Sequence, residues 1–357
     1  MNHIKTHFFR DRRVWDSCAE TYERQIVGGH PDITAFETFE EDFLDHLLRF
    51  LAKNQKRPIK LMDIGCGSGR LHLRYGTMTS PVDGNLHNQK ITKARDSNFK
   101  LDHDPLLSKK LREVWGIDFS NKMIEIARRK IEYYGLDQTQ STKLSFEQGS
   151  AFELQPQGSG ILPVVVCLVN SIGVMQGPEG AMALFKSIRR ALESSGGIGI
   201  ISCYQQEYLK SYGLGQYEST MDVSGQPSWV MPDSYATPEY IQVPRCYKKA
   251  YDDNPEVKVD VFDHHGQIVK KGHCLIRDPE RTAQVLKSGH ISTFSDYESN
   301  WYSFRQMDEW IQQLWPPTAL HIKTKDLDME RAEPAQMAIL DYQGHLDSFF
   351  EIWFSTK

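Results

Sequence analysis

The 357-residue chain lacks the features that mark secreted, disulfide-rich and membrane proteins. Its six cysteines are scattered and form no Cys-x-x-Cys pair, so we expect reduced thiols rather than a disulfide framework or a zinc site. No apolar run approaches the roughly 20 residues that a membrane-spanning helix needs. The first residues also lack the apolar core of a signal peptide. These absences predict a cytoplasmic protein that does not enter a membrane.

Neither sign of charge dominates, because 42 Lys and Arg residues stand against 47 Asp and Glu residues. Nucleic-acid-binding domains usually carry a basic excess or a basic stripe, and a net charge of −5 indicates neither. Segment 77–110 contains six Lys and Arg residues, but four aspartates are interspersed among them. We therefore expect no nucleic-acid partner.

A glycine-rich loop is the most informative feature that is present. Segment 60–70 reads KLMDIGCGSGR, a short apolar run that ends in Asp63 and continues into glycines at positions 65, 67 and 69. Glycine permits backbone angles and close ligand approach that any Cβ would forbid. The dinucleotide-binding fingerprint Gly-x-Gly-x-x-Gly fails here, because the sixth position counted from Gly65 is Arg70. The pattern predicts a strand, a tight turn and a ligand that lies on bare backbone.

Strands and helices alternate after this loop. Residues 114–118 predict a second buried strand that ends in Asp118, and residues 119–131 predict a helix with Ser120 as its N-cap. An acid at that position can accept hydrogen bonds from both hydroxyls of a ribose. The further elements are strands within 144–152, 162–170 and 198–203 and a helix over 181–193. This order predicts a doubly wound parallel sheet.

The chain divides by pattern into four parts. Residues 1–56 predict a helical N-terminal cap, with one helix over 36–52, and residues 57–203 predict the core with an inserted surface loop at 77–110. Residues 204–300 lose the alternation and predict an inserted β-rich cap. Residues 301–357 complete the sheet, with a helix over 303–314 and closing strands over 320–324 and 349–354.

The motif D-x-G-x-G-x-G after a strand, with Asp118 ending the next strand, resembles the class I S-adenosylmethionine (SAM)-dependent methyltransferases. The resemblance implies an α/β fold, a Rossmann-like seven-stranded sheet that is mostly parallel with its last strand antiparallel, and SAM as cofactor. Within the class, the chain looks most like the glycine and sarcosine N-methyltransferase branch. Segments 13–22, 166–173 and 300–304 carry that second resemblance.

The resemblance also implies roles for individual residues. Asp63 orients the glycine loop and the methionine ammonium, Asp118 holds the ribose, and Ser150 occupies a slot where the family usually places an acid. The full set expected to bind the cofactor is Asp63, Gly65, Cys66, Gly67, Asp118, Phe119, Met123, Ser150, Ala151, Phe152, Leu168 and Asn170. For Cys66, a small side chain that fits is a better interpretation than redox chemistry.

Methyl transfer needs proximity, orientation and exclusion of water more than a strong catalytic group. Tyr22 and His290 are the candidates for positioning or deprotonating the acceptor, because an imidazole can act as a base near neutrality. The residues expected to meet the substrate are Trp15, Arg24, Asn170, Tyr204, Trp301 and Tyr302. Packing or solvation is the competing interpretation for each. His264, His265 and His273 show no zinc spacing, so we expect no metal.

The leading hypothesis is methyl transfer to a small polar molecule, an amino acid or amine nitrogen. Carbon or oxygen methylation of an aromatic amino acid or natural-product intermediate is an alternative, because the predicted cap contains many aromatic residues. RNA or protein methylation and a non-catalytic SAM-binding role are further alternatives. A homodimer formed through the cap is possible.

Overall fold

A computed structural model describes thirteen segments of the chain. They are residues 15–16, 19, 31–80, 103–136, 141–175, 177–205, 240–244, 259–262, 268–273, 298–315, 319–323, 335–344 and 346–355.

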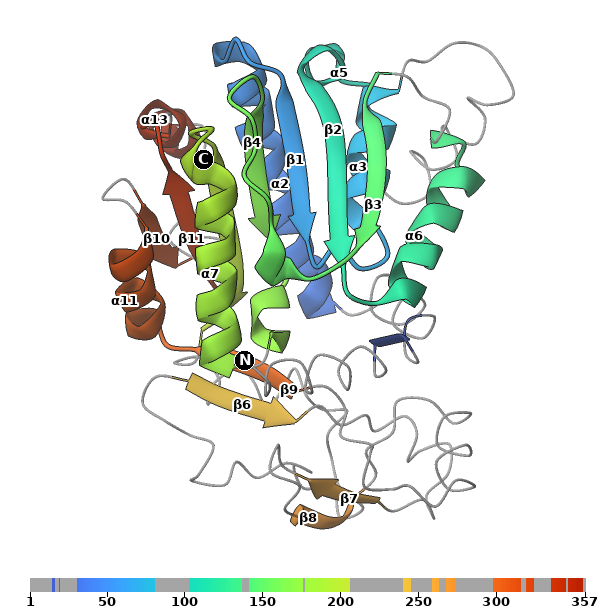
Figure 1. Cartoon of the computed structure of the whole chain (residues 1–357), viewed down its shortest axis with the longest axis vertical. Coiled ribbons are helices and arrows are strands. Elements are labelled where there is room, and N and C mark those ends of the chain that lie inside the picture. The colour runs from blue at the N-terminus through green and yellow to red at the C-terminus, as the bar shows by residue number, and fades with distance from the viewer. Residues whose placement is uncertain are drawn as a thin grey trace.

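The centre of the fold is a seven-stranded sheet in the order β10-β11-β5-β4-β1-β2-β3 (Figure 1). Its strands are β1 (Ile59–Ile64), β2 (Leu111–Asp118), β3 (Lys143–Gln148), β4 (Leu162–Cys167), β5 (Ile198–Tyr204), β10 (Leu320–Lys323) and β11 (Ala335–Asp341). β11 runs antiparallel to both neighbours, whereas the pairs from β5 to β3 are parallel. This confirms the predicted Rossmann-like sheet with an antiparallel closing strand.

Helices cover both faces of the sheet (Figure 1). On one face lie α2 (Pro31–Asn54), α3 (Arg70–Thr79) and α6 (Asn121–Tyr133), and on the other lie α7 (Gly177–Glu193) and α11 (Phe304–Leu314). β4 and β5 are buried along their whole length, as strands covered on both faces must be. Each helical layer therefore has its own apolar core against the sheet.

Side-chain caps fix where several helices begin. The Ser120 hydroxyl accepts a hydrogen bond from the Met123 N–H, which confirms the predicted N-cap of α6. Ser303 caps α11 in the same way through the Gln306 N–H. The α6 cap at Ser120 lies two residues after Asp118, so it sets the start of the helix close to that carboxylate.

The C-terminal segment corrects the sequence analysis. Residues 349–354 were expected to form a strand, but they lie in the helix α13 (Asp347–Ser355), and the antiparallel strand is β11. Phe349 and Trp353 are four residues apart, so a helix presents both to one neighbour. Their rings lie 5.6 Å and 5.4 Å from the ring of Phe43 on α2. Burial of this pair against α2 favours the helix.

Segment 77–110 is helical at both of its described ends. α3 continues through Thr79, and Asp104 caps the short helix α5 (Pro105–Lys110) by accepting hydrogen bonds from the Leu106 and Leu107 N–H groups. The ends of the predicted loop are therefore helical. Residues 81–102, the rest of the predicted loop apart from its short flanks, lie outside the described residues.

The predicted cap contributes two small antiparallel sheets. β6 (Tyr240–Pro244) pairs with β9 (Glu298–Tyr302), and β7 (Val259–Phe262) pairs with β8 (Ile268–His273). Both strands of the second sheet lie within 204–300, where a β-rich cap was expected.

A buried group of charged residues joins α2 to α3, and we call it the α2–α3 ion network. It consists of Glu40, Glu41 and Asp45 on α2 and of Arg70, Arg74 and Tyr75 on α3. Arg74 binds Asp45 through Nε at 3.0 Å and Nη2 at 2.7 Å, and its Nη1 binds Glu41 at 2.8 Å. The network fixes α3 to α2.

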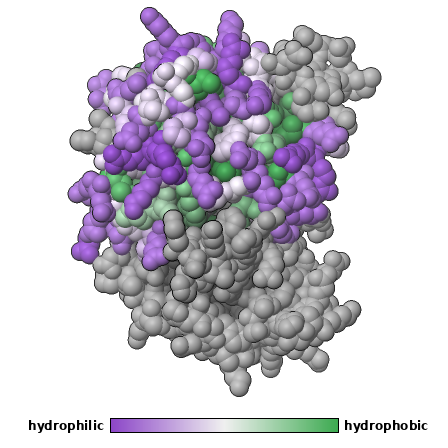
Figure 2. Space-filling view, viewed as in Figure 1, coloured by the Kyte–Doolittle hydropathy of each residue, from purple (hydrophilic) through white to green (hydrophobic). Residues whose placement is uncertain are grey.

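The described part of the surface on the face in Figure 2 is mainly hydrophilic, with scattered hydrophobic residues. Among the described helices, none combines the length and apolarity that crossing a membrane would require.

Candidate functional site

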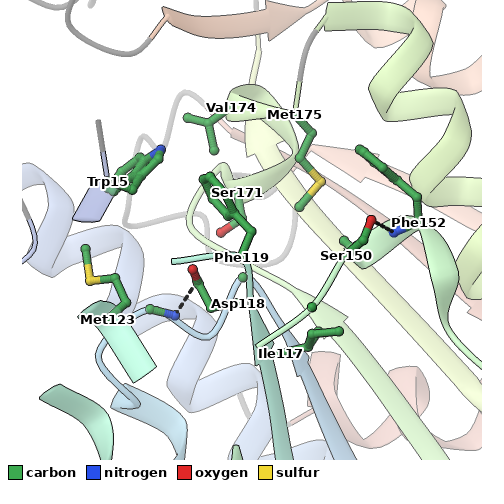
Figure 3. Close-up of a pocket in the computed structure, with 14 residues that line it drawn as sticks. Trp15, Ile117, Asp118, Phe119, Met123, Ser150, Phe152, Ser171, Val174 and Met175 are labelled. Atoms are coloured by element: carbon green, nitrogen blue, oxygen red, sulfur yellow. Dashed lines mark hydrogen bonds between the residues drawn. The ribbon is translucent and has the colours of Figure 1, made fainter. Parts of the chain in front are cut away.

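A pocket lies at the carboxyl ends of the central parallel strands (Figure 3). It sits where the strand order reverses, because the chain proceeds from β1 to β2 and β3 on one side and then to β4 and β5 on the other. Ligands of open α/β sheets bind at such a switch point. The lining residues are Trp15, Gly65, Gly67, Ile117, Asp118, Phe119, Met123, Gly149, Ser150, Ala151, Phe152, Ser171, Val174 and Met175.

The glycine loop leaves β1 through left-handed backbone angles. Gly65 has φ +72°, Gly67 has φ +51° and Gly69 has φ +80°, a region that other residues rarely adopt. The N–H groups of Gly65 and Cys66 both bind the Ile117 carbonyl, at 2.8 Å and 3.2 Å. A Cβ on Gly65 would lie 3.1 Å from Ser171, so the loop and the turn after β4 face each other closely.

Asp118 ends β2 and holds the loop from the opposite side. Its Oδ2 accepts a hydrogen bond from the Gly67 N–H at 2.9 Å, and its Oδ1 accepts one from the Ser120 N–H at 2.8 Å. Burial raises the pKa of the Asp118 carboxyl to about 6, although these N–H groups oppose the shift and Asp16 adds to it. Each carboxylate oxygen can accept a second hydrogen bond, so the group can bind a ligand hydroxyl while it holds the loop.

Asp63 is a second buried acid next to the loop, 6% exposed. Burial raises the pKa of its carboxyl to about 7; the Arg70 guanidinium opposes this shift, and the Asp118 charge adds to it. Two acids that repel each other in a desolvated site make a cationic ligand favourable.

Cys66 is buried between these acids. Burial, followed by the charges of Asp118 and Asp63, raises the pKa of its thiol well above the ordinary value. A thiol that resists ionisation is a poor nucleophile, which supports the interpretation of Cys66 as a packing residue.

The pocket has two sides about Asp118. In Figure 3, Trp15 and Met123 lie on one side, and Ser150 and Phe152 lie on the other. The Ser150 hydroxyl accepts a hydrogen bond from the Phe152 N–H at 3.2 Å and so caps the 3₁₀ turn Ala151–Glu153. This arrangement forms a slot of apolar side chains beside a carboxylate, which suits a flat heterocycle attached to a sugar.

Described residues of the N-terminal part hold Trp15 at the pocket. The Asp16 Oδ1 accepts hydrogen bonds from the Ser120 hydroxyl at 2.7 Å and from the Lys122 N–H at 3.1 Å. Ala19 is fully buried and packs with Met123. The expectation that Trp15 belongs to the site agrees with its position, although its neighbours are residues predicted to bind the cofactor.

Several predicted residues do not line the pocket, and Asp63 and Cys66, which lie beside the glycine loop, are among them. Leu168 packs into the core, and the Asn170 side chain accepts a hydrogen bond from the Tyr204 N–H at 3.1 Å. Tyr204 is 5% exposed, and Tyr302 is fully buried with its ring 5.0 Å from that of Trp310. The packing of these residues explains their absence from the lining.

Other predicted residues cannot be compared with the structure. Tyr22, Arg24 and His290 lie outside the described residues, as does the side chain of Trp301. Within the described segments, no group of three or more His, Cys, Asp and Glu residues is placed to hold a metal ion.

The lining includes residues that the sequence analysis did not select. Ser171, Val174 and Met175 belong to the 3₁₀ turn after β4 and its end, and Ile117 and Gly149 flank Asp118 and Ser150. Ser171 was within the segment that carried the family resemblance, so a signal for it existed. Val174 and Met175 come from a turn whose direction depends on tertiary contacts.

A family model described as a methyltransferase domain matches residues 36–233, more than half of the chain. No curated protein matches. Solved structures that resemble the chain include a SAM-dependent methyltransferase from Clostridium acetobutylicum ATCC 824. It has 13% identity, a TM-score of 0.43, and coverage of 92% of this chain and 98% of that one.

Another is a SAM-dependent methyltransferase from Methanosarcina mazei, with 12% identity, a TM-score of 0.40, and coverage of 82% and 95%. A third is magnesium protoporphyrin IX methyltransferase from Synechocystis PCC 6803 with bound SAM, with 17% identity, a TM-score of 0.35, and coverage of 56% and 77%. Because these TM-scores are low, the family match is the comparison on which the following argument depends.

Proposed function

Since this chain belongs to the methyltransferase domain family and is a SAM-dependent methyltransferase, we propose that it methylates an amino acid or amine nitrogen of a small polar molecule. The observation that supports SAM as the methyl donor is the pairing of two buried acids, Asp63 and Asp118, with a bare glycine loop at the switch point of the sheet. SAM is a cation at its sulfonium, and the raised pKa values of both acids favour a ligand of that charge.

The order of strands indicates which residue would hold each part of the cofactor. Asp118 on β2 would accept hydrogen bonds from the ribose hydroxyls, and Met123, Ser150 and Phe152 would enclose the adenine on the β3 side. The methionine part then extends toward β1 and β4, between Gly65 and Ser171. When bound, SAM supplies a methyl group made electrophilic by the positive sulfur.

The pocket residues would orient the reactants and exclude water rather than take part in covalent chemistry. The backbone around Gly65 and Gly67 permits close approach, and Trp15, Val174 and Met175 cover the pocket with apolar surface. Excluding water and fixing the acceptor relative to the methyl group lower the barrier of an in-line displacement. Asp118 is the only ionisable side chain among the described lining residues, so Tyr22 and His290 remain our proposed groups for orienting or deprotonating the acceptor.

A small acceptor fits the described surroundings better than a macromolecule. Trp15 lies over the pocket and is held there by Asp16, which narrows the approach from that side. An amine of a small molecule can enter such a site in its neutral form and leave as the methylated product.

The proposal can be tested by incubating the protein with methyl-labelled SAM and a fractionated extract of the native cells. We expect label in the small-molecule fraction, and we expect Asp118→Ala to abolish it. Mass spectrometry of the labelled product would then identify the acceptor atom. Label in RNA or protein would overturn the substrate class, and binding of SAM without any labelled product would favour a non-catalytic role.

A further inference from the structure

Glu40 on α2 is a buried acid that lies outside the pocket and yet contacts both structures that face each other across it. We propose that Glu40 is a positioning residue, which holds the turn after β4 against the glycine loop and thereby sets the space for the methionine part of SAM. This inference rests on the proposed function, because it assumes that SAM occupies the pocket.

The burial of Glu40 requires an explanation. The residue is 1% exposed and its side chain is fully buried. Removing a carboxylate from water is strongly unfavourable unless donors or cations bind its oxygens. A neutral side chain would suffice for packing at this position, so the contacts of the carboxylate indicate its role.

Those contacts reach three elements. The Glu40 Oε1 accepts hydrogen bonds from the Val169 N–H at 2.9 Å and from the Ser202 hydroxyl on β5. Its Oε2 pairs with Nη2 of Arg70 at 3.4 Å, and Arg70 directly follows the last glycine of the loop. One carboxylate therefore links the ends of β4 and β5 to the start of α3.

The turn that Glu40 holds has a strained backbone. Val169 and Asn170 have φ values of +50° and +56°, and among the described residues they are the only non-glycine positions with positive φ. This conformation is especially unfavourable for a β-branched residue such as Val169, so it persists only where surrounding contacts hold it. Glu40 fixes the Val169 N–H, and the Asn170 side chain fixes the end of β5 through the Tyr204 N–H.

The strained turn determines one wall of the pocket. The Ser171 N–H binds the Leu168 carbonyl at 3.0 Å, which closes the turn around Val169 and Asn170. Ser171 then faces Gly65 at the contact distance given above. If the turn relaxes, Ser171 moves relative to Gly65, and the methionine part of the cofactor loses its fit while the adenosine part keeps its contacts.

Glu41 offers a matched control. It is buried on the same helix and binds the same arginine, with Oε1 at 2.7 Å from Arg70 Nη1 and Oε2 at 2.8 Å from Arg74 Nη1. Its contacts belong to the α2–α3 ion network rather than to the turn after β4. Glu41→Gln should therefore lower stability without moving Ser171.

The experiment compares Glu40→Gln and Glu41→Gln with two probes by calorimetry. S-adenosylhomocysteine has both the adenosine and the amino acid part, and methylthioadenosine lacks the amino acid. We expect Glu40→Gln to lower the affinity for S-adenosylhomocysteine about tenfold. The affinity for methylthioadenosine should fall less than about twofold. Glu41→Gln should leave both affinities within about twofold of the wild type, even if urea unfolding shows it to be less stable.

A second substitution distinguishes a positioning role of Glu40 from a general loss of structure. Glycine at position 169 adopts a positive φ without strain, so adding Val169→Gly to Glu40→Gln should restore most of the lost affinity for S-adenosylhomocysteine. Equal weakening of both probes in Glu40→Gln, or no rescue by Val169→Gly, would overturn the inference. If Glu40→Gln does not fold, Ser202→Ala removes one donor to the same carboxylate. That variant should lower the affinity for S-adenosylhomocysteine more than the affinity for methylthioadenosine. Unchanged affinities would count against the positioning role of Glu40.

The design also distinguishes the two proposals. If the wild type binds neither probe, both the proposed function and the positioning role of Glu40 are wrong. If the wild type binds both probes and Glu40→Gln binds them equally well, only the positioning role of Glu40 fails.

Discussion

The α2–α3 ion network and the two acids beside the glycine loop, Asp63 and Asp118, bury their carboxylates to a similar extent, but their charges are compensated to different degrees. Asp45 in the network is 5% exposed, and Asp63 and Asp118 at the pocket are 6% and 8% exposed. In the network, Arg74 forms two hydrogen bonds with Asp45 and one with Glu41. At the pocket, Arg70 lowers the pKa of Asp63 but does not offset the effect of burial.

The difference also appears in the arginine. Burial lowers the pKa of the Arg74 guanidinium, but its hydrogen bonds to Asp45 and the charges of Asp45 and Glu41 outweigh this and raise it above its ordinary value. The fold thus neutralises the acids that support α3 and leaves the acids of the pocket short of positive charge. The two acids beside the glycine loop therefore favour a cationic ligand. Four measurements test this difference between the two regions.

The largest effect should follow from removing Arg74. Arg74→Ala leaves Asp45 and Glu41 buried without their main cation, and breaking a buried ion pair in this way costs about 3–5 kcal/mol. Urea unfolding followed by circular dichroism would measure the loss. Arg49→Ala is the control, because Arg49 is 43% exposed and its contact with Asp104 should contribute roughly 1 kcal/mol or less. Equal losses in the two variants would show that burial does not distinguish these charges.

Removing the charge of Asp63 should act in the opposite direction on stability. A folded-state pKa of about 7 lies above the ordinary value of 3.8, so the native protein binds the proton more tightly than the unfolded chain. The cost of ionising Asp63 therefore grows as the pH rises from about 4 to about 7. We expect Asp63→Asn to be more stable than the wild type by on the order of 4 kcal/mol at pH 8, with the difference shrinking toward pH 4.

The same variant should bind SAM more weakly, because it lacks a charge that attracts the cation. Urea unfolding at pH 8 and pH 4.5, combined with SAM titration, would test both halves. Destabilisation of Asp63→Asn at pH 8 would contradict the idea that the pocket holds an uncompensated acid.

Binding of SAM should release protons. A cationic ligand lowers the pKa of the two acids, and Asp63 with a pKa of about 7 is half protonated at pH 7 in the free protein. We expect release of roughly half a proton per SAM at that pH. Calorimetry in phosphate and in Tris, which differ in ionisation enthalpy, gives the number of protons released per SAM bound. Asp63→Asn should reduce it markedly, and proton uptake by the wild type would refute the electrostatic argument.

The smallest effect concerns Asp16, whose charge contributes to the raised pKa of Asp118. Asp16→Asn keeps an oxygen that can accept from Ser120 and Lys122 but removes the charge. The pH below which SAM binding weakens should then fall by roughly a few tenths of a unit. Glu147→Gln, an exposed acid on the neighbouring strand β3, should leave that pH unchanged. A shift in the upward direction would argue against repulsion between Asp16 and Asp118.

The part of the pocket around Asp118 could be predicted from sequence because its residues follow directly from strand ends. Parallel strands place their carboxyl ends at one edge of the sheet, so Gly65, Asp118 and Ser150 meet there whatever the loops do. The cap at Ser120 was predictable for a similar reason, since it depends on residues three apart. The structure confirms this cap and the sheet.

The remaining features depend on contacts between distant residues. Glu40 and Val169 are separated by 129 positions, and nothing local marks Glu40 as different from its neighbour Glu41. The error at 349–354 has a related cause, because an apolar run this short fits a strand as well as a helix. Burial of Phe349 and Trp353 against α2 favours the helix over the strand, and the local sequence pattern does not indicate that packing.

The contact between α13 and α2 has a consequence for biosynthesis. Phe43 is translated roughly 300 residues before Phe349 and Trp353, which at about 5–20 residues per second is a delay of roughly 15–60 seconds. During that time the apolar face of α2 has no aromatic partner from α13. We therefore expect nascent chains of this protein to engage chaperones on the ribosome until the last helix has emerged.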